Sequence, residues 1–195
     1  MNRRDSLKSL VFGSIGVGVL LEGCVSGVDN ETVANSLKKF NYGRTPKEKE
    51  YDKLLFSKKC FTNNQMTLIS KISNLILPPN EFGSINDAEV PELIEFMAKD
   101  IPSYETPLKE GLVALNQNSN EKFKKVFIDC DESQQKSILD LMAYPDPDLS
   151  SSEQSEEVKW FSLFRNLTMT GYYTSKVGIE ELGYKGNTPN VWDGV

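Results

Sequence analysis

The sequence predicts an all-α protein, a compact bundle of about five to six helices that follows a signal peptide and a polar tether. Apolar residues recur at spacings of three and four, and loops rich in Pro, Gly, Asp and Ser separate these segments. No stretch alternates apolar and polar residues beside a hairpin turn. Because 38% of the 195 residues are hydrophobic, the chain is long and apolar enough to form one domain with a core.

The first element is an N-terminal targeting segment. Arg3, Arg4 and Lys8 form a basic start, and the uncharged run from Ser9 to Leu21 follows. This run is shorter than the roughly 20 residues that cross a bilayer, and it has the length of the apolar region of a signal peptide. We therefore expect residues 1–23 to be a signal peptide.

The basic start also resembles the twin-arginine export signal, which directs the export of folded proteins. Arg3, Arg4, Leu7 and Lys8 carry this resemblance, whereas Ser6 stands where that signal usually has a large apolar residue. The alternative is the basic region of an ordinary signal peptide.

The end of the signal peptide resembles a bacterial lipobox. Leu21 and Gly23 precede Cys24 as in that motif, although Glu22 places an unusual charge there. Cys24 would then be lipidated and become the new N-terminus; the alternative is a structural cysteine. Residues 24–60 are polar, so we expect a flexible tether that holds a domain of residues 61–195 off the membrane.

Two cysteines remain in the chain after Cys24. An even pair in an exported protein is typical of a disulfide, which Cys60 and Cys130 could form outside the cytoplasm. The alternative is two buried free thiols, because the sequence gives no distance between them.

The first helices of the predicted domain follow from caps and apolar spacing. Thr62 or Asn63 can cap a helix that Pro78 and Pro79 end, and Pro91 suits the first turn of a second helix. The apolar positions of these two helices are Met66, Ile69, Ile72 and Ile76, and then Leu93, Ile94 and Met97. Leu108, Leu112 and Leu115 indicate a third helix, and Phe123, Val126 and Phe127 a short fourth.

The later helices are indicated in the same way. Asp131 with Gln134 forms a capping signal before a fifth helix that contains Ile138, Leu141 and Met142. The longest apolar stretch, Val158 to Val177, is apolar over a wide arc, which is typical of a central helix in a bundle. The segment after Gly183 shows no periodicity.

The composition excludes several classes of function. The chain has no His, so neither a Ser-His-Asp triad nor His-ligated zinc or haem is available. It lacks the Gly-rich loops that hold dinucleotides or phosphates. A net charge of -6 argues against a nucleic-acid surface. We therefore predict no catalytic, cofactor-binding or metal site in this chain.

Several sequence blocks resemble a known family. They are Ile76-Leu77-Pro78, Asp87-Ala88-Glu89-Val90-Pro91, Gln134-Gln135, Trp160-Phe161 with Leu167 to Ser175, and Leu182-Gly183-Tyr184-Lys185-Gly186. From about residue 65 to the C-terminus, the chain resembles the small subunit (subunit 3, or gamma chain) of the gluconate 2-dehydrogenase family.

The resemblance implies a non-catalytic, periplasmic helical subunit. It implies a partner that is an FAD-dependent oxidoreductase of the glucose-methanol-choline type, acting on sugars or sugar acids, and often a further multi-haem cytochrome c subunit. The small subunit would escort the flavoprotein through twin-arginine export and stabilise it, anchored to the envelope membrane by its lipid. The alternative is a free-standing envelope lipoprotein that acts as a binding or scaffold module.

Aromatic residues near the C-terminus are the candidates for the partner interface. Tyr and Trp are favoured at interfaces because they bury a large area and keep a polar group. We expect this role for Tyr172, Tyr173, Tyr184 and Trp192. The alternative places Tyr172 in the core and Trp192 in a frayed tail.

Overall fold

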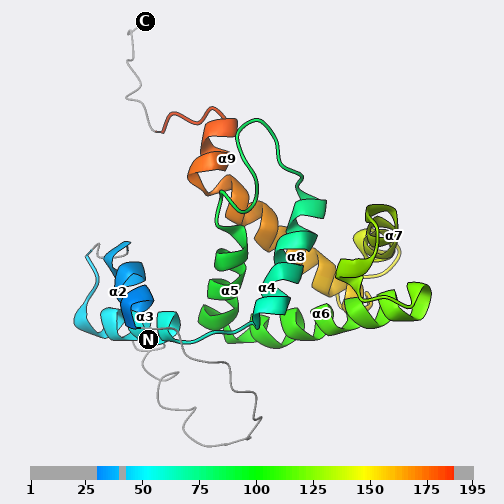
Figure 1. Ribbon diagram of the computed structural model, residues 1–195, viewed down its shortest axis with the longest axis horizontal. Helices are drawn as coiled ribbons and strands as arrows, with labels where there is room; N and C mark the ends of the chain where they lie inside the picture. Colours follow the sequence, from blue (N-terminus) through cyan, green and yellow to red (C-terminus); the bar gives the residue numbers. More distant parts are fainter. Residues whose placement is uncertain (1–29, 40–42, 187–195) are drawn as a thin grey trace, which may run out of the picture.

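The computed structural model describes residues 30–39 and 43–186 (Figure 1). Within these ranges all regular structure is helical, which confirms the predicted all-α class. The elements are α2 (Asn30–Lys39), α3 (Pro46–Ser57), α4 (Asn63–Ile76), α5 (Val90–Asp100), α6 (Pro102–Phe123), the 3-10 helix η1 (Phe127–Asp129), α7 (Glu132–Ala143), α8 (Glu156–Tyr173) and α9 (Lys176–Glu181).

Helix α8 is the centre of the bundle. It contacts α4, α5, α6, α7 and α9, as expected for the segment with the widest apolar arc. Figure 1 shows α8 crossing the molecule obliquely, with α6 across its lower end, α7 beside that end and α9 at the other. Within the described ranges, no helix has both the length and the apolar character that crossing a bilayer requires.

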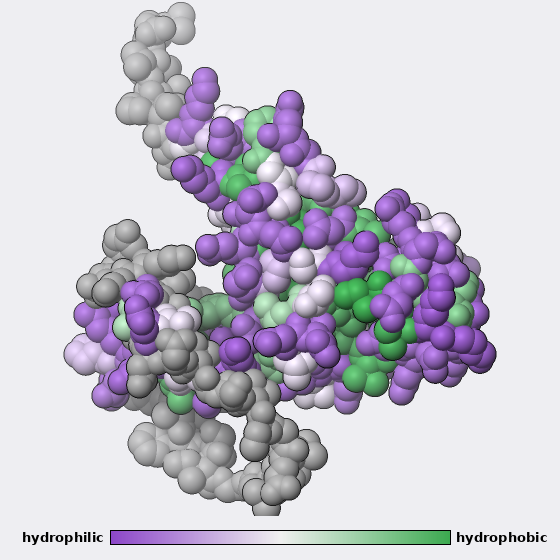
Figure 2. Space-filling model, viewed as in Figure 1, coloured by the Kyte–Doolittle hydropathy of each residue, from purple (hydrophilic) through white to green (hydrophobic). Residues whose placement is uncertain are grey.

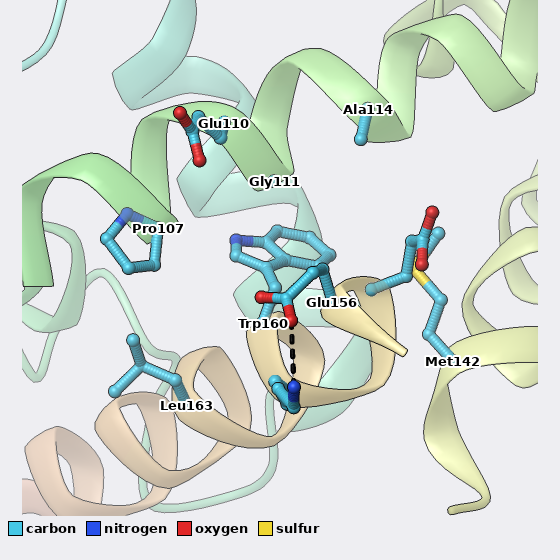
Figure 3. A pocket seen from close by; sticks show the side chains of 10 residues that line it. Pro107, Glu110, Gly111, Ala114, Met142, Glu156, Trp160 and Leu163 are labelled. Carbon is cyan, nitrogen blue, oxygen red and sulfur yellow. Dashed lines mark hydrogen bonds and ion pairs between the residues drawn. The ribbon is translucent and has the colours of Figure 1, made fainter. Parts of the chain in front are cut away.

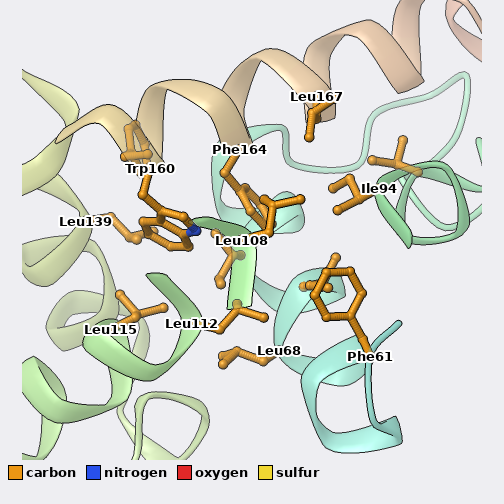
Figure 4. Packing of buried hydrophobic residues seen from close by; sticks show 14 of the residues in the cluster. Phe61, Leu68, Ile94, Leu108, Leu112, Leu115, Leu139, Trp160, Phe164 and Leu167 are labelled. Atoms are coloured by element: carbon orange, nitrogen blue, oxygen red, sulfur yellow. The ribbon is translucent and has the colours of Figure 1, made fainter. Parts of the chain in front are cut away.

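The core lies where α4, α5, α6 and α8 meet. Figure 4 shows Phe61, Leu68, Ile94, Leu112 and Phe164 converging from these elements and the segment before α4. Their side chains are at most 5% exposed. The predicted positions Ile94 and Leu112 therefore lie on inward faces. The prediction is wrong for Leu141 of the fifth helix, which is 70% exposed.

Three predicted helix starts are confirmed, two of them as capping boxes. Thr62 caps α4, and the side chain of Gln65 accepts a hydrogen bond from the Thr62 backbone, so the two form a capping box. Asp131 and Gln134 form the same motif at the start of α7. These hydrogen bonds, first from the Gln134 backbone and then from Ser133, lower the pKa of Asp131. Pro91 lies in the first turn of α5, where its missing N–H costs nothing.

The predicted irregular structure of residues 24–60 is wrong where the structure describes that segment. Helices α2 and α3 form there, because Thr45 and Glu48 make a capping box ahead of α3 and Pro46 suits its first turn. The phenyl ring of Phe56 lies 5.7 Å from that of Phe96 on α5. Figure 1 shows α2 and α3 together at one side of the bundle. The lipid-tether role of this segment stays a prediction.

Two helix boundaries also differ from the prediction. Phe123 is the last residue of α6, because Lys124 takes a left-handed conformation (φ 58°) and ends the helix, so Phe127 lies in η1 rather than in a fourth α-helix. The apolar stretch from Val158 to Val177 is two helices, because Ser175 leaves α8 and caps α9.

Candidate functional site

The C-terminal end of α8, helix α9 and the turn after α9 form an open hollow on the surface. Its walls are Tyr173 and Thr174 at the end of α8, Ile179 on α9, and the following turn of Leu182, Gly183, Tyr184 and Lys185. Leu182 and Tyr184 are each 61% exposed. In Figure 2, apolar surface gathers over α9 within a mostly polar part of this face. Apolar residues that cluster on a surface mark interaction sites.

The hollow depends on a sharp corner between α8 and α9. The Ser175 hydroxyl donates to the carbonyl of Tyr172 at 2.6 Å and accepts from the backbone N–H of Gly178 at 3.2 Å. A Cβ atom at Gly178 would lie 2.2 Å from the Tyr172 carbonyl oxygen, so only glycine fits there. This corner turns α9 back onto the end of α8.

Asn80, in the loop before α5, connects α8 to α9 through its side chain. Its Oδ1 accepts a hydrogen bond from the Tyr172 hydroxyl at 3.3 Å, and its Nδ2 donates to Glu181 Oε2 at 2.9 Å. The same Oδ1 accepts from the backbone of Phe82 and Gly83. Burial, followed by a hydrogen bond with Glu181, raises the pKa of Tyr172, so this phenol stays protonated as a donor.

The structure divides the predicted interface residues. Tyr173 and Tyr184 both line the hollow. Tyr172 is 1% exposed and belongs to the core, which agrees with the alternative interpretation and removes it from the exposed surface. The rings of Tyr172 and Tyr173 meet edge to face at 5.1 Å.

Several residues in and next to the hollow were not identified from the sequence, among them Ile179, Leu182 and Asn80. Ile179 and Leu182 supply its apolar walls, and their three-residue spacing was the only local signal. No local sequence signal pointed to Asn80, because its partner Tyr172 lies 92 residues away along the chain. Of the other predicted residues, several lie outside the described ranges: Arg3, Arg4, Leu7, Lys8, Cys24 and Trp192.

The two remaining cysteines are buried free thiols. Cys60 lies before α4, where its backbone N–H donates to Glu95 Oε1, and burial raises the pKa of its thiol to about 11. Cys130 Sγ lies 3.1 Å from the Ser119 hydroxyl at the end of α6. Each thiol has its own surroundings, which agrees with the free-thiol alternative.

In the described part of the chain, no group of three His, Cys, Asp or Glu side chains could hold a metal ion.

Comparison with known proteins gives one match. The family model for gluconate 2-dehydrogenase subunit 3 covers residues 63–194, which include α4 to α9 and the hollow. Searches among curated proteins and among solved structures gave no match. The match spans most of the chain and covers every sequence block that carries the resemblance, so the chain belongs to the gluconate 2-dehydrogenase subunit 3 family.

Proposed function

We propose that this chain is the non-catalytic small subunit of a periplasmic, flavin-dependent sugar or sugar-acid dehydrogenase complex. Its partner would be an FAD-dependent oxidoreductase of the glucose-methanol-choline type, and a multi-haem cytochrome c subunit would accept the electrons. The chain would escort the flavoprotein through twin-arginine export, stabilise it, and hold it at the envelope membrane through the lipid on Cys24.

The membership of the family supports the accessory role, since the family is named for a subunit of a dehydrogenase. The observation that carries the docking proposal is the hollow between α8 and α9. Tyr173, Ile179, Leu182 and Tyr184 bring two aromatic and two aliphatic side chains to one open surface within the matched residues. Such a combination of aromatic rings and apolar walls is typical of protein–protein contacts.

Copurification tests the partnership. A tagged full-length chain should bring down a yellow flavoprotein when the two are produced together. The double variant L182S/Y184S should lose most of that flavoprotein, because it removes two exposed apolar walls of the hollow. L141S is the matched control, since Leu141 is 70% exposed on α7, away from the hollow.

Export is tested separately. Replacing Arg3 and Arg4 by Lys should leave both proteins in the cytoplasm if the chain carries the flavoprotein through the twin-arginine route. A flavoprotein that reaches the periplasm without this chain would refute the escort role. A chain that purifies alone, with no flavin, would favour the free-standing lipoprotein, and turnover by the purified chain would refute the non-catalytic role.

A further inference from the structure

A second concave site lies at the other end of α8, between its first turns and helices α6 and α7. It is a cavity of about 330 Å³. Figure 3 shows Trp160 at its centre, with Pro107, Ala114, Met142 and Leu163 around it. The cavity therefore has an aromatic floor and apolar walls, which suit an apolar group.

The floor of this cavity holds a hydrogen-bond donor without a partner. Trp160 is 4% exposed, and its indole N–H is buried with no acceptor among the described residues. In Figure 3 the nitrogen edge of the indole is directed toward the side of the cavity where Pro107 lies. A Cβ atom at Gly111 would lie 2.2 Å from Nε1, so the N–H is packed against α6 and the cavity offers the apolar part of the indole to an occupant.

The rim of the cavity is acidic. Lys159 Nζ pairs with Glu156 at 2.8 Å, which leaves no free cation among the residues that line the cavity. Glu110 and Glu157 are exposed on the same rim and make no ion pair within the described ranges. The field at the mouth of the cavity is therefore negative and favours a cationic neighbour for the apolar group.

We propose that this cavity binds a segment of another protein chain in which an apolar side chain lies next to Arg or Lys. The apolar side chain enters the cavity and packs on the Trp160 ring, and the basic side chain pairs with Glu110 or Glu157. A chain segment supplies both groups within consecutive residues. The cavity lies at the opposite end of α8 from the hollow, so it would be a second binding site, beyond the one in the proposed function.

The test uses the indole N–H resonance of Trp160 in the purified full-length chain. The chain has two Trp residues, so the W192F variant assigns this resonance. The probe is the tetrapeptide acetyl-Ala-Arg-Leu-Ala-amide. Two matched peptides replace its Arg by Glu or its Leu by Ser. The A114L variant fills the cavity, and V113L is its control because Val113 is 52% exposed on the same helix and does not line the cavity.

We expect the Arg-Leu peptide to shift the Trp160 resonance saturably, and each matched peptide to bind at least fivefold more weakly. A114L should abolish the shift and V113L should retain it, whereas E110Q/E157Q should reduce the preference for Arg over Glu. The proposal is overturned by no shift in the unaltered chain, by equal responses to the three peptides, or by A114L binding as well as V113L. No flavoprotein takes part, so these outcomes are independent of the copurification and export tests.

Discussion

The backbone of Gly111 on α6 lies directly against the indole of Trp160 on α8. A Cβ atom at Gly111 would come within 2.0 Å of Trp160 Cδ1 and 2.2 Å of Nε1. The two helices can therefore approach this closely only because residue 111 has no side chain.

The variant G111A should destabilise the protein. The added methyl group forces Trp160 or α6 to move, and such overpacking costs about 1–3 kcal/mol, partly offset by the roughly 1 kcal/mol that Ala gains over Gly in a helix. Thermal or urea unfolding measures the difference. Q117A, at an exposed position of α6, should change the free energy of unfolding by less than about 0.5 kcal/mol. A G111A protein as stable as Q117A would contradict the close contact.

The buried hydrogen bond between Ser73 on α4 and Thr168 on α8 predicts an asymmetry between two variants. The Thr168 hydroxyl donates to the Phe164 carbonyl at 2.9 Å, so it accepts from Ser73 at 3.3 Å. T168V leaves the Ser73 hydroxyl buried without that acceptor and should cost about 1–3 kcal/mol, whereas S73A should cost clearly less. Urea unfolding of both single variants and the double variant checks this order. Equal losses would show that the two hydroxyls are not paired in this direction.

The Cys60 thiol predicts a loss of stability at high pH. Burial raises the pKa of this thiol from 9.0 to about 11, so the folded protein holds the proton more tightly than the unfolded chain. The resulting stabilisation is fully present below pH 9 and falls as the pH rises to about 11, by roughly 2 kcal/mol. The free energy of unfolding of the C60A variant, subtracted from that of the unaltered chain at each pH, isolates this effect from the Lys and Tyr groups. A difference that does not change between pH 8 and pH 11 would refute the buried environment.

The ring contact between Phe56 and Phe96 predicts local loosening of α3. F56A removes the ring that packs on α5, so amide hydrogen exchange should speed up within residues 46–57. The exchange of α4 to α8 should stay unchanged, because their core does not include Phe56. L54A is the control, since Leu54 is 47% exposed on the same helix. Equal exchange in both variants would mean that the ring pair does not hold α3 to the bundle.

The sequence predicted the helices whose signals are local. The Thr62 and Asp131 caps and the proline at position 91 each depend on residues within one turn, and all three are confirmed. The wide apolar arc of α8 likewise predicted its central position. The capping box of Thr45 with Glu48 is an equally local signal, but the polar character of residues 24–60 favoured a tether over a helix.

The features that the sequence did not predict depend on contacts between distant residues. The division of the last apolar stretch at Ser175 requires the carbonyl of Tyr172 and the absence of a side chain at Gly178, so periodicity alone could not show it. Tyr173 and Tyr184 line the hollow, and their role at a partner interface stays a prediction. Periodicity alone could not assign Tyr172 to the core or to the surface, because Tyr172 is covered by contacts with distant residues such as Asn80.

The Asn80 side chain joins the loop before α5 to Tyr172 and Glu181, which lie 92 and 101 residues further along the chain. The contacts that hold α9 against α8 are therefore complete only when the loop before α5 has packed against both helices. A partner that bound the hollow would therefore bind it only after this long-range contact had formed.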